Sequence, residues 1–105
     1  MRKLLAGAAF LSLTATPAFA GFQDFTFVNA SPYTVVYLYG AADYEDTWSA
    51  DLLGDNVLLP GEEVYIPVNG YGDHCWFELL IEDEAGGSVV YTDIDLCTET
   101  HIYYE

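Results

Sequence analysis

The sequence predicts an all-β protein, a small antiparallel β-sandwich or partly open barrel of six or seven short strands with one disulfide. Three observations lead to this prediction. Short runs rich in β-branched and aromatic residues recur along the chain. Gly, Pro, Asn and Asp separate these runs at short intervals, which is typical of turns. The only two cysteines, Cys75 and Cys97, lie at the open ends of a predicted hairpin.

The first residues carry the pattern of a signal peptide. A basic start (1–3) precedes an apolar run (4–13), and Ala18-Phe19-Ala20 fits the small-x-small cleavage rule. The apolar run is too short to cross ~30 Å of hydrocarbon, which favours cleavage over an N-terminal membrane anchor. We therefore expect residues 1–20 to be removed and residues 21–105 to form one β-sandwich domain, periplasmic or secreted.

The predicted strands, in chain order, are residues 22–28, 33–39, 63–68, 75–83, 88–97 and 100–104. In the strand 33–39, strict alternation would place Val35 with Tyr37 and Tyr39 on one face. Leu38 would then lie on the opposite face together with Val36. We expect both faces of this strand to be at least partly covered.

One short helical turn near residues 46–53 is the predicted departure from β-structure. Asp46 or Thr47 is a candidate N-cap, and Gly54 stands where a C-cap belongs. We expect Trp48, Leu52 and Leu53 to face inward, because a helix this short needs burial to hold it in place.

Two prolines give positional information. Pro60 and Gly61 occupy the middle of a predicted type II turn between Leu59 and Glu62. Pro67 removes one ladder donor from the strand 63–68, which predicts that this strand lies at a sheet edge.

The hairpin 75–97 contains a conflict of register. Opposite residues of an antiparallel pair have a constant index sum, and pairing Cys75 with Cys97 would put Phe77 opposite an aspartate. Apolar pairing requires an odd sum, with Phe77 opposite Ile94 and Ile81 opposite Val90. Burial of each large apolar side chain is worth ~1.5–3 kcal/mol, so we expect the odd register near the turn and a bulge between Ile94 and Cys97.

The charge of the chain restricts its partners. All 17 Asp and Glu residues lie within residues 21–105, and the only Lys and Arg residues, Arg2 and Lys3, lie in the predicted signal peptide. Nothing in residues 21–105 could neutralise phosphates, so nucleic acid and anionic membrane surfaces are excluded as direct partners. A cationic protein, a polyamine or a divalent metal ion remains, and the alternative is that the acidity serves solubility.

Several landmarks together resemble a family of small exported bacterial β-proteins of unknown role. They are Tyr37-Leu38-Tyr39, Trp48, Asp51-Leu52-Leu53-Gly54, Leu59-Pro60-Gly61, Cys75, Phe77-Glu78-Leu79, Gly86 and Asp95-Leu96-Cys97. Members are sometimes labelled argininosuccinate lyase, a long helical enzyme that a short β-patterned chain cannot build. Members often have Gly at the position of Ser49 and Asp at the position of Glu78. The resemblance covers most of residues 21–105 and implies no mechanism.

Two groups of carboxylates are candidate calcium sites. Asp43, Glu45, Asp46 and Asp51 lie in the predicted non-β segment, where turns could bring their oxygens together on Ca²⁺. The acidic hairpin tip, residues 82–84, offers a second group. Neither matches an EF-hand, and the alternative is that both are solvated acidic loops.

Catalytic motifs are not recognised. His74 and His101 are too few to hold zinc or copper. Ser31, Ser49 and Ser88 lack the Gly-x-Ser-x-Gly context of a nucleophile. Paired carboxylates leave a small hydrolase as a distant alternative, and we predict that the protein is not an enzyme.

Aromatic residues are the remaining candidates for contact with a partner. The chain has nine tyrosines and two tryptophans, and we select Tyr37, Tyr39, Trp48 and Tyr71 as partner-binding candidates. The alternative is that tyrosine simply favours strands. The sequence thus predicts an exported, monomeric, acidic binding or structural module that binds or inhibits a cationic protein, as small periplasmic lysozyme inhibitors do. A calcium-binding acidic module is the alternative.

Overall fold

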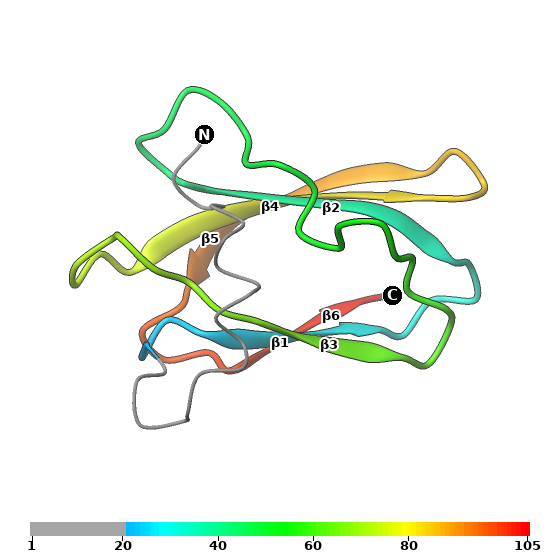
Figure 1. Cartoon of the computed structure of the whole chain (residues 1–105), viewed down its shortest axis with the longest axis horizontal. Coiled ribbons are helices and arrows are strands. Elements are labelled where there is room, and N and C mark those ends of the chain that lie inside the picture. The colour runs from blue at the N-terminus through cyan, green and yellow to red at the C-terminus, as the bar shows by residue number, and fades with distance from the viewer. Residues whose placement is uncertain (1–20) are drawn as a thin grey trace.

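The computed structural model describes residues 21–105, which form a sandwich of two three-stranded sheets (Figure 1). The predicted signal peptide, residues 1–20, lies outside the described residues. The strands are β1 (Phe25–Asn29), β2 (Val35–Ala42), β3 (Glu63–Ile66), β4 (Trp76–Asp83), β5 (Ser88–Asp95) and β6 (His101–Tyr104). The predicted fold class, with six strands and the Cys75–Cys97 disulfide, is confirmed.

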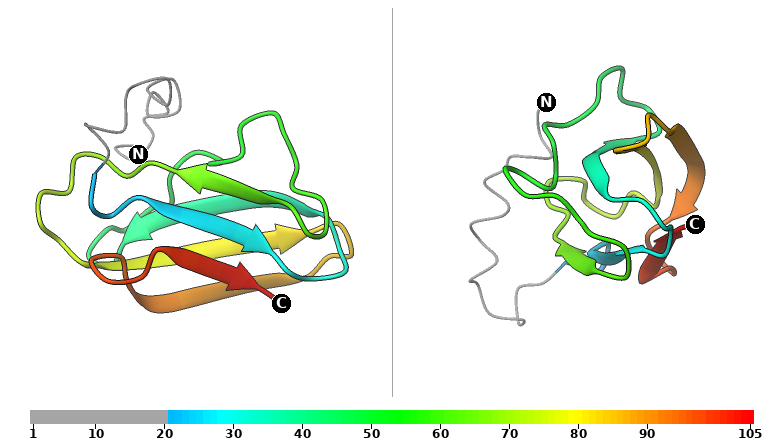
Figure 2. Two further views of the ribbon diagram at one scale, coloured as in Figure 1. Left: turned by 90° about the horizontal axis from the view of Figure 1, so that it is seen from below. Right: turned by 90° about the vertical axis from the view of Figure 1, so that its right-hand side faces the viewer.

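One sheet has the order β3-β1-β6 and the other the order β2-β4-β5. The second sheet is antiparallel throughout, whereas in the first β1 pairs antiparallel with β3 and parallel with β6. The parallel pair departs from the antiparallel sandwich expected. It arises because the chain crosses from β5 in one sheet to β6 in the other before β6 runs beside β1 (Figure 2).

The core lies between the two sheets and follows the alternation of each strand. Phe25 and Phe27 of β1 and Leu79 and Ile81 of β4 are all buried and belong to the same hydrophobic cluster. Burying side chains of this size contributes ~1.5–3 kcal/mol each, so these strands carry much of the stability.

A bulge interrupts the alternation of β2. Val35 pairs with Asp83 and Tyr37 pairs with Glu82, so one extra residue, Val36, is inserted on β2. The expectation that Val35 shares a face with Tyr37 and Tyr39 is therefore wrong. The reason is that the insertion brings Val35 onto the core face that Leu38 also occupies, so both apolar side chains are buried.

A second bulge lies in β5, but not where the register argument placed it. Phe77 pairs with Ile94 as expected, whereas Ile81 pairs with Val89 instead of Val90. The register shifts between Phe77 and Leu79, where Glu78 alone opposes the two residues Thr92 and Asp93.

The position of this bulge follows from burial. Val89, Tyr91 and Ile94 all turn toward the core, and the three-residue step from Tyr91 to Ile94 requires one extra residue. Asp93 supplies it with φ 57°, a conformation that aspartate tolerates better than most residues. The predicted bulge between Ile94 and Cys97 is therefore wrong.

The ladder ends at Asp95 and the chain turns there. The Asp95 carbonyl accepts hydrogen bonds from the backbone N–H groups of Thr98 (3.2 Å) and Glu99 (2.9 Å). Its carboxylate accepts one from the N–H of Cys97 at 3.0 Å. The turn lets Cys97 reach Cys75, with a Cα–Cα distance of 5.1 Å, without a regular ladder through Cys97.

The predicted helical turn near residues 46–53 is wrong, because residues 21–105 contain no helix. The segment lies along the free edge of β2, where the N–H groups of Ser49 and Leu52 donate to the carbonyls of Gly40 and Leu38. These N–H groups are therefore not available for a helix.

The side chains of this segment complete the pairing with the edge. The Ser49 hydroxyl accepts the Gly40 N–H (3.0 Å), and the Asp51 carboxylate accepts the Leu38 N–H (3.1 Å). Leu52 and Leu53 are buried as expected, while Trp48 is only partly buried. The segment thus covers an edge that would otherwise be open to another strand.

The predictions from proline are confirmed. Gly61 has φ 87° and the Glu62 N–H donates to the Leu59 carbonyl at 3.0 Å, as a type II turn requires. β3 lies at a sheet edge and ends at Ile66, immediately before Pro67.

No helix within residues 21–105 has the length and apolar character needed to cross a membrane.

Candidate functional site

Because residues 21–105 contain no Lys or Arg, the carboxylates of this chain accept hydrogen bonds from other donors. Asp83 shows the pattern at the tip of the β4–β5 hairpin, where it is buried. One of its oxygens accepts the N–H groups of Ala85 and Gly87, both at 2.9 Å, and the other accepts the Tyr104 hydroxyl at 2.6 Å. Since Tyr104 lies on the other sheet, this carboxylate joins the two layers.

Asp24 plays a similar part beside the opposite sheet. It accepts the Tyr65 hydroxyl through one oxygen and the Val68 N–H, at 2.8 Å, through the other. The pattern in both places is a carboxylate that serves backbone and phenol donors in place of a cation.

These hydrogen bonds shift the pKa values of both tyrosines and of Asp83. The bond to Asp24 raises the pKa of Tyr65 to about 12, and the bond to Asp83 raises the pKa of Tyr104 to about 12. The Tyr104 hydroxyl, together with the Gly87 N–H, lowers the pKa of Asp83, although its burial acts in the opposite direction.

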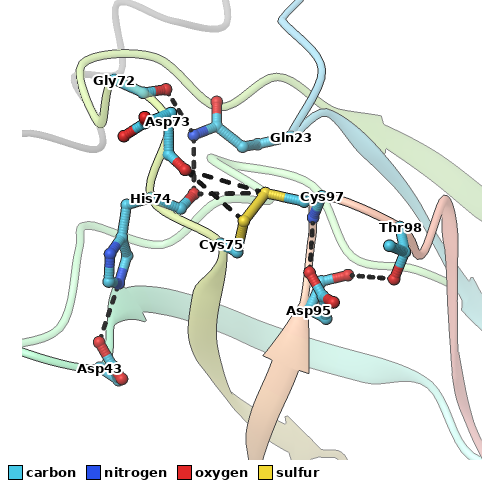
Figure 3. The surroundings of a disulfide bond; sticks show 9 residues. All are labelled: Gln23, Asp43, Gly72, Asp73, His74, Cys75, Asp95, Cys97 and Thr98. Atoms are coloured by element: carbon cyan, nitrogen blue, oxygen red, sulfur yellow. Dashed lines mark hydrogen bonds and ion pairs between the residues drawn. A yellow bond between two sulfur atoms is a disulfide. The ribbon is translucent and has the colours of Figure 1, made fainter.

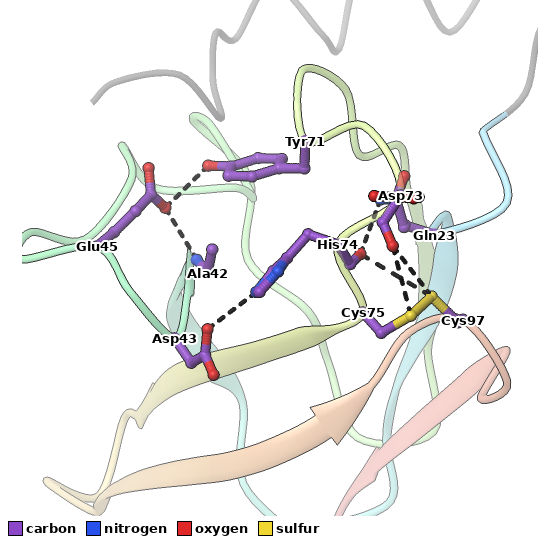
Figure 4. A network of polar contacts seen from close by, with 9 residues as sticks. All are labelled: Gln23, Ala42, Asp43, Glu45, Tyr71, Asp73, His74, Cys75 and Cys97. Carbon is purple, nitrogen blue, oxygen red and sulfur yellow. Dashed lines mark hydrogen bonds and ion pairs between the residues drawn. A yellow bond between two sulfur atoms is a disulfide. The ribbon is translucent and has the colours of Figure 1, made fainter.

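The four carboxylates predicted as a calcium site do not share one position, and Figure 4 shows two of them, Asp43 and Glu45, with different partners. Asp43 contacts His74, and Glu45 accepts the Ala42 N–H at 2.8 Å and the Tyr71 hydroxyl at 2.9 Å. Asp51 lies further along the chain, against the edge of β2, and Asp46 is exposed.

Asp51 is occupied by the backbone. One of its oxygens accepts the N–H groups of Leu38 (3.1 Å) and Leu53 (3.0 Å). Burial raises the pKa of Asp51, and these two hydrogen bonds partly offset that effect. Within residues 21–105, the carboxylates of the predicted calcium site do not come together as a group of three ligand atoms within 4.8 Å.

Asp43 and His74 form the salt-bridge contact that links the loop after β2 to the loop before β4. The His74 Nε2 atom lies 2.9 Å from Asp43 Oδ1. The imidazole also contacts Tyr44 and Phe77 edge-on, at ring-centroid distances of 4.9 and 5.5 Å. The pair lies at the end of the sandwich near the disulfide, with no serine or cysteine nucleophile bonded to His74 among the described residues.

The one cluster of side chains with metal-ligand atoms close together in the described part is formed by Cys75, Asp95 and Cys97 (Figure 3). Both sulfurs are consumed by the disulfide, so they offer no thiolate to a metal. Carbonyls surround this end of the hairpin, and the Gln23 side-chain amide donates to those of Gly72 and His74, both at 2.9 Å. The disulfide therefore has a structural role, in which it joins the two ends of the hairpin.

The aromatic candidates divide into two kinds. Tyr37 is 46% exposed, and its ring stacks beside that of Tyr39 at 6.0 Å with an interplanar angle of 12°. Tyr71 is only 5% exposed, because its ring packs against Phe77 in the core and its hydroxyl bonds to Glu45. A buried ring cannot contact a partner, so Tyr71 is corrected to a core residue, and the partly buried Trp48 offers only part of its surface.

The outer face of the sheet β2-β4-β5 carries aromatic, aliphatic and acidic side chains in cross-strand rows. One row is formed by Tyr37, Glu82 and Ser88. The next is formed by Tyr39, Leu80 and Val90. Beyond it, Glu78 opposes the bulge of β5.

Burial and nearby negative charges act on the pKa of Tyr39. Burial raises the pKa of Tyr39, and the negative charges of Asp51 and Glu82 raise it further. The two carboxylates are therefore close enough to Tyr39 for their charge to raise its pKa.

The outer face of the sheet β3-β1-β6 has a different character. Tyr65, Tyr103 and His101 are exposed on it, and the rings of His101 and Tyr103 stack at 6.3 Å. Its carboxylate nearest Tyr65 is Asp24, which is already bonded to that tyrosine. Glu63 is the acid that this face contributes from a strand.

Comparison of the chain with protein-family models, with curated protein sequences and with solved structures finds no match in any of the three.

Sequence reasoning did not identify the pairs Asp24–Tyr65 and Asp83–Tyr104. Their members are 41 and 21 residues apart, and no local pattern relates them. One signal was present: a chain with many carboxylates, many tyrosines and no Lys or Arg in residues 21–105 must use phenol and backbone donors.

Proposed function

We propose that this chain is an exported acidic binding module whose partner is a cationic protein, and that it is not an enzyme. One observation carries the proposal: residues 21–105 contain all 17 Asp and Glu residues and no Lys or Arg, which gives them a formal charge of −17. Several of these carboxylates serve the fold. Others, among them Glu78, Glu82 and Glu99, have no hydrogen-bond donor or cation within residues 21–105, so their charge acts outward.

Export is part of the proposal. A disulfide persists in an oxidising compartment, and the Cys75–Cys97 bond is compatible with the periplasm or the outside of the cell. Cleavage after residue 20 would also remove Arg2 and Lys3 and leave the acidic domain alone. The resemblance to small exported bacterial β-proteins agrees with this location.

Binding would rest on two physical effects. The negative field steers a cationic partner and raises its association rate, with values up to 10⁸–10⁹ M⁻¹s⁻¹ at low salt for strongly steered pairs. Exposed tyrosines on a rigid sheet then supply contact area at small entropic cost. Residues 21–105 combine the negative charge and the exposed tyrosines in one β-sandwich.

The proposal is tested with the protein expressed as the full chain and purified after export. Lysozyme serves as a cationic probe and serum albumin as an acidic control. We expect lysozyme to associate at a rate that falls steeply between about 20 and 200 mM NaCl, because the Debye length shortens over this range. If lysozyme and other basic proteins show no more association than albumin at low salt, the proposed function is wrong.

If the protein were a calcium-binding module, calcium would raise its melting temperature specifically, and we do not expect this. Three of the four predicted carboxylates are bonded to different partners and Asp46 is exposed, so we expect about 1 mM CaCl₂ to change the melting temperature no more than about 1 mM MgCl₂ does. Extracellular calcium modules, in contrast, saturate near this concentration. A saturable rise in melting temperature that is specific to calcium would favour the metal-binding function instead.

A further inference from the structure

The surface that could receive a cationic partner is the outer face of the sheet β2-β4-β5. We name it the tyrosine–acid face and define it by Tyr37, Tyr39, Glu78, Leu80, Glu82 and Val90. The sheet exposes Tyr37 and Val90 almost to half of their surface, at 46% and 47%. Exposed apolar side chains that lie together in this way can contact a partner.

The arrangement of this face suits one kind of cation. Tyr37 and Glu82 are direct cross-strand partners, so their Cβ atoms are about 4.5–5.5 Å apart. A planar guanidinium can lie on the phenol ring and pair with the carboxylate beside it, because it stacks on aromatic faces and binds carboxylates with two parallel hydrogen bonds. An ammonium group has no plane to stack.

Charge complementarity favours this face over the opposite one. The side-chain carboxylates of Glu78 and Glu82 form no hydrogen bond or ion pair with any residue of the described part. On the face of β3-β1-β6, the phenol of Tyr65 already engages Asp24, and His101 lies beside Tyr103. On that opposite face the strand carboxylate Glu63 has Val28 as its cross-strand partner, whereas on the tyrosine–acid face Glu82 lies directly opposite the ring of Tyr37.

The spacing along β4 separates the two carboxylates of this face. Glu78 and Glu82 are four residues apart on one strand, which corresponds to about 13 Å. The row of Tyr39, Leu80 and Val90 lies between them and can take the apolar stem of a long side chain.

We propose that the tyrosine–acid face binds an arginine-bearing surface segment of the cationic partner, with guanidinium groups stacked on Tyr37 and Tyr39 and paired with Glu82 and Glu78. This inference rests on the proposed function and assigns it a surface and a side-chain preference. A second copy of this chain is not the occupant, since its charge of the same sign would repel.

The test uses hexa-arginine and hexa-lysine peptides, which carry equal charge, and titration calorimetry at about 50 mM NaCl. Exposed cation–π contacts correspond to about a two- to fivefold change in affinity each, so we expect the full-length exported protein to bind hexa-arginine at least that much more tightly. The variant Tyr37→Ala should lose most of this preference, and Tyr37→Phe should keep it because the ring remains.

The charge contribution has its own matched pair of variants. Glu82→Gln should weaken both peptides, whereas Glu63→Gln on the opposite face removes the same charge and should weaken them less. Tyr103→Ala serves as the aromatic control on that face. Circular dichroism in the tyrosine region checks that each variant is folded.

The outcomes separate the inference from the proposed function. If hexa-arginine and hexa-lysine bind equally, and Glu82→Gln has no larger effect than Glu63→Gln, the assigned face is wrong while binding of cationic proteins stands. If neither peptide nor any basic protein binds at low salt, the proposed function fails and the inference fails with it.

Discussion

At the scale of single residues, the fold depends on polar side chains whose hydrogen bonds are complete. Asn29 is the clearest case, because its side chain is fully buried. Its amide donates to the carbonyls of Tyr33 (2.7 Å) and Leu58 (2.9 Å), and its oxygen accepts the N–H and hydroxyl of Ser31. Asn29 thereby ties the turn after β1 to the chain that precedes β3.

We expect Asn29→Ala to lower the free energy of unfolding by about 2–4 kcal/mol, because it leaves the buried Ser31 N–H without its acceptor and removes one of the two hydrogen bonds that each of the Tyr33 and Leu58 carbonyls accepts. Urea unfolding followed by tyrosine fluorescence measures the change. Ser31→Ala is the matched control and should cost clearly less, because it removes only the hydroxyl. Equal losses in the two variants would mean that the Asn29 amide contributes nothing beyond its packing.

Asp83 should make stability depend on acid pH. Hydrogen bonds hold its pKa below the usual value in the folded protein. A group with a lowered pKa contributes stability that is present above its unfolded pKa of about 3.9 and is lost as the pH falls through the folded pKa. We expect Asp83→Asn to be less stable at pH 7 and to show a smaller further loss than the wild type below about pH 4.

The measurement is the melting temperature between pH 2 and pH 7. Asp46→Asn, which removes an exposed carboxylate, is the control for the change in net charge. If Asp83→Asn and Asp46→Asn follow the same curve, the hydrogen bonds of Asp83 do not contribute to acid stability. We also expect a side chain at position 87 to destabilise the protein, because a Cβ added to Gly87 would lie 2.7 Å from Asp83 Oδ2.

The site residues illustrate what a sequence can predict at this scale. Tyr37 and Tyr39 belong to a strand whose alternation was visible, and both lie on an outer face. Tyr71 lies five residues after the end of β3 at Ile66, between two glycines, where nothing in the pattern tells whether the ring faces in or out. Its burial depends on a long-range contact, the hydrogen bond from its hydroxyl to Glu45 26 residues away.

At the scale of elements, the positions of strands and turns could be predicted but their registers could not. Every predicted strand is present to within a few residues, because β-branched and aromatic runs and turn residues act locally. The bulges of β2 and β5 depend on which apolar residues the opposite sheet buries. Val35 with Leu38, and Tyr91 with Ile94, are three residues apart, and only the packed core reveals that each pair shares a face.

The segment 46–53 was mistaken for a helix for a related reason. Its capping residues are real signals, but Asp51 and Ser49 use their side chains to accept the N–H groups of β2. Tertiary pairing with a strand edge overrides the local preference, as it commonly does in short segments.

The disulfide gives the prediction that belongs to the hairpin. Cys75 and Cys97 are separated by 22 residues in sequence. Closing a loop of this length restricts the unfolded chain and contributes about 3 kcal/mol in the chain-entropy model. We expect the double variant Cys75→Ser/Cys97→Ser to lose about that much stability in urea unfolding while the tyrosine–acid face keeps its binding, since that face lies along the paired part of β4 and β2.

The reduced wild-type protein is the control for the effect of the serine hydroxyls. It should unfold at nearly the same urea concentration as the double variant. A double variant as stable as the oxidised protein would show that the turn at Asp95 holds the strands together without the covalent bond.

At the scale of the whole molecule, charge opposes the fold. Residues 21–105 extend over 35 × 29 × 24 Å and carry no Lys or Arg. At 0.01 M ionic strength the Debye length is about 30 Å, so carboxylates on opposite faces repel one another. The histidine–aspartate contact of His74 and Asp43 is the only salt-bridge contact found among the described residues, so little attraction offsets this repulsion.

We therefore expect the melting temperature to rise as NaCl increases from about 10 to about 300 mM, because the Debye length falls to less than 10 Å and isolates the charges from one another. A triple variant, Asp46→Asn/Asp55→Asn/Glu99→Gln, removes three exposed carboxylates without a hydrogen-bond partner in the described part, and should show a smaller rise. Calorimetric scans of both proteins at matched concentration measure the slopes. A melting temperature that stays constant over this range would mean that the carboxylates of the native state repel no more than those of the unfolded chain.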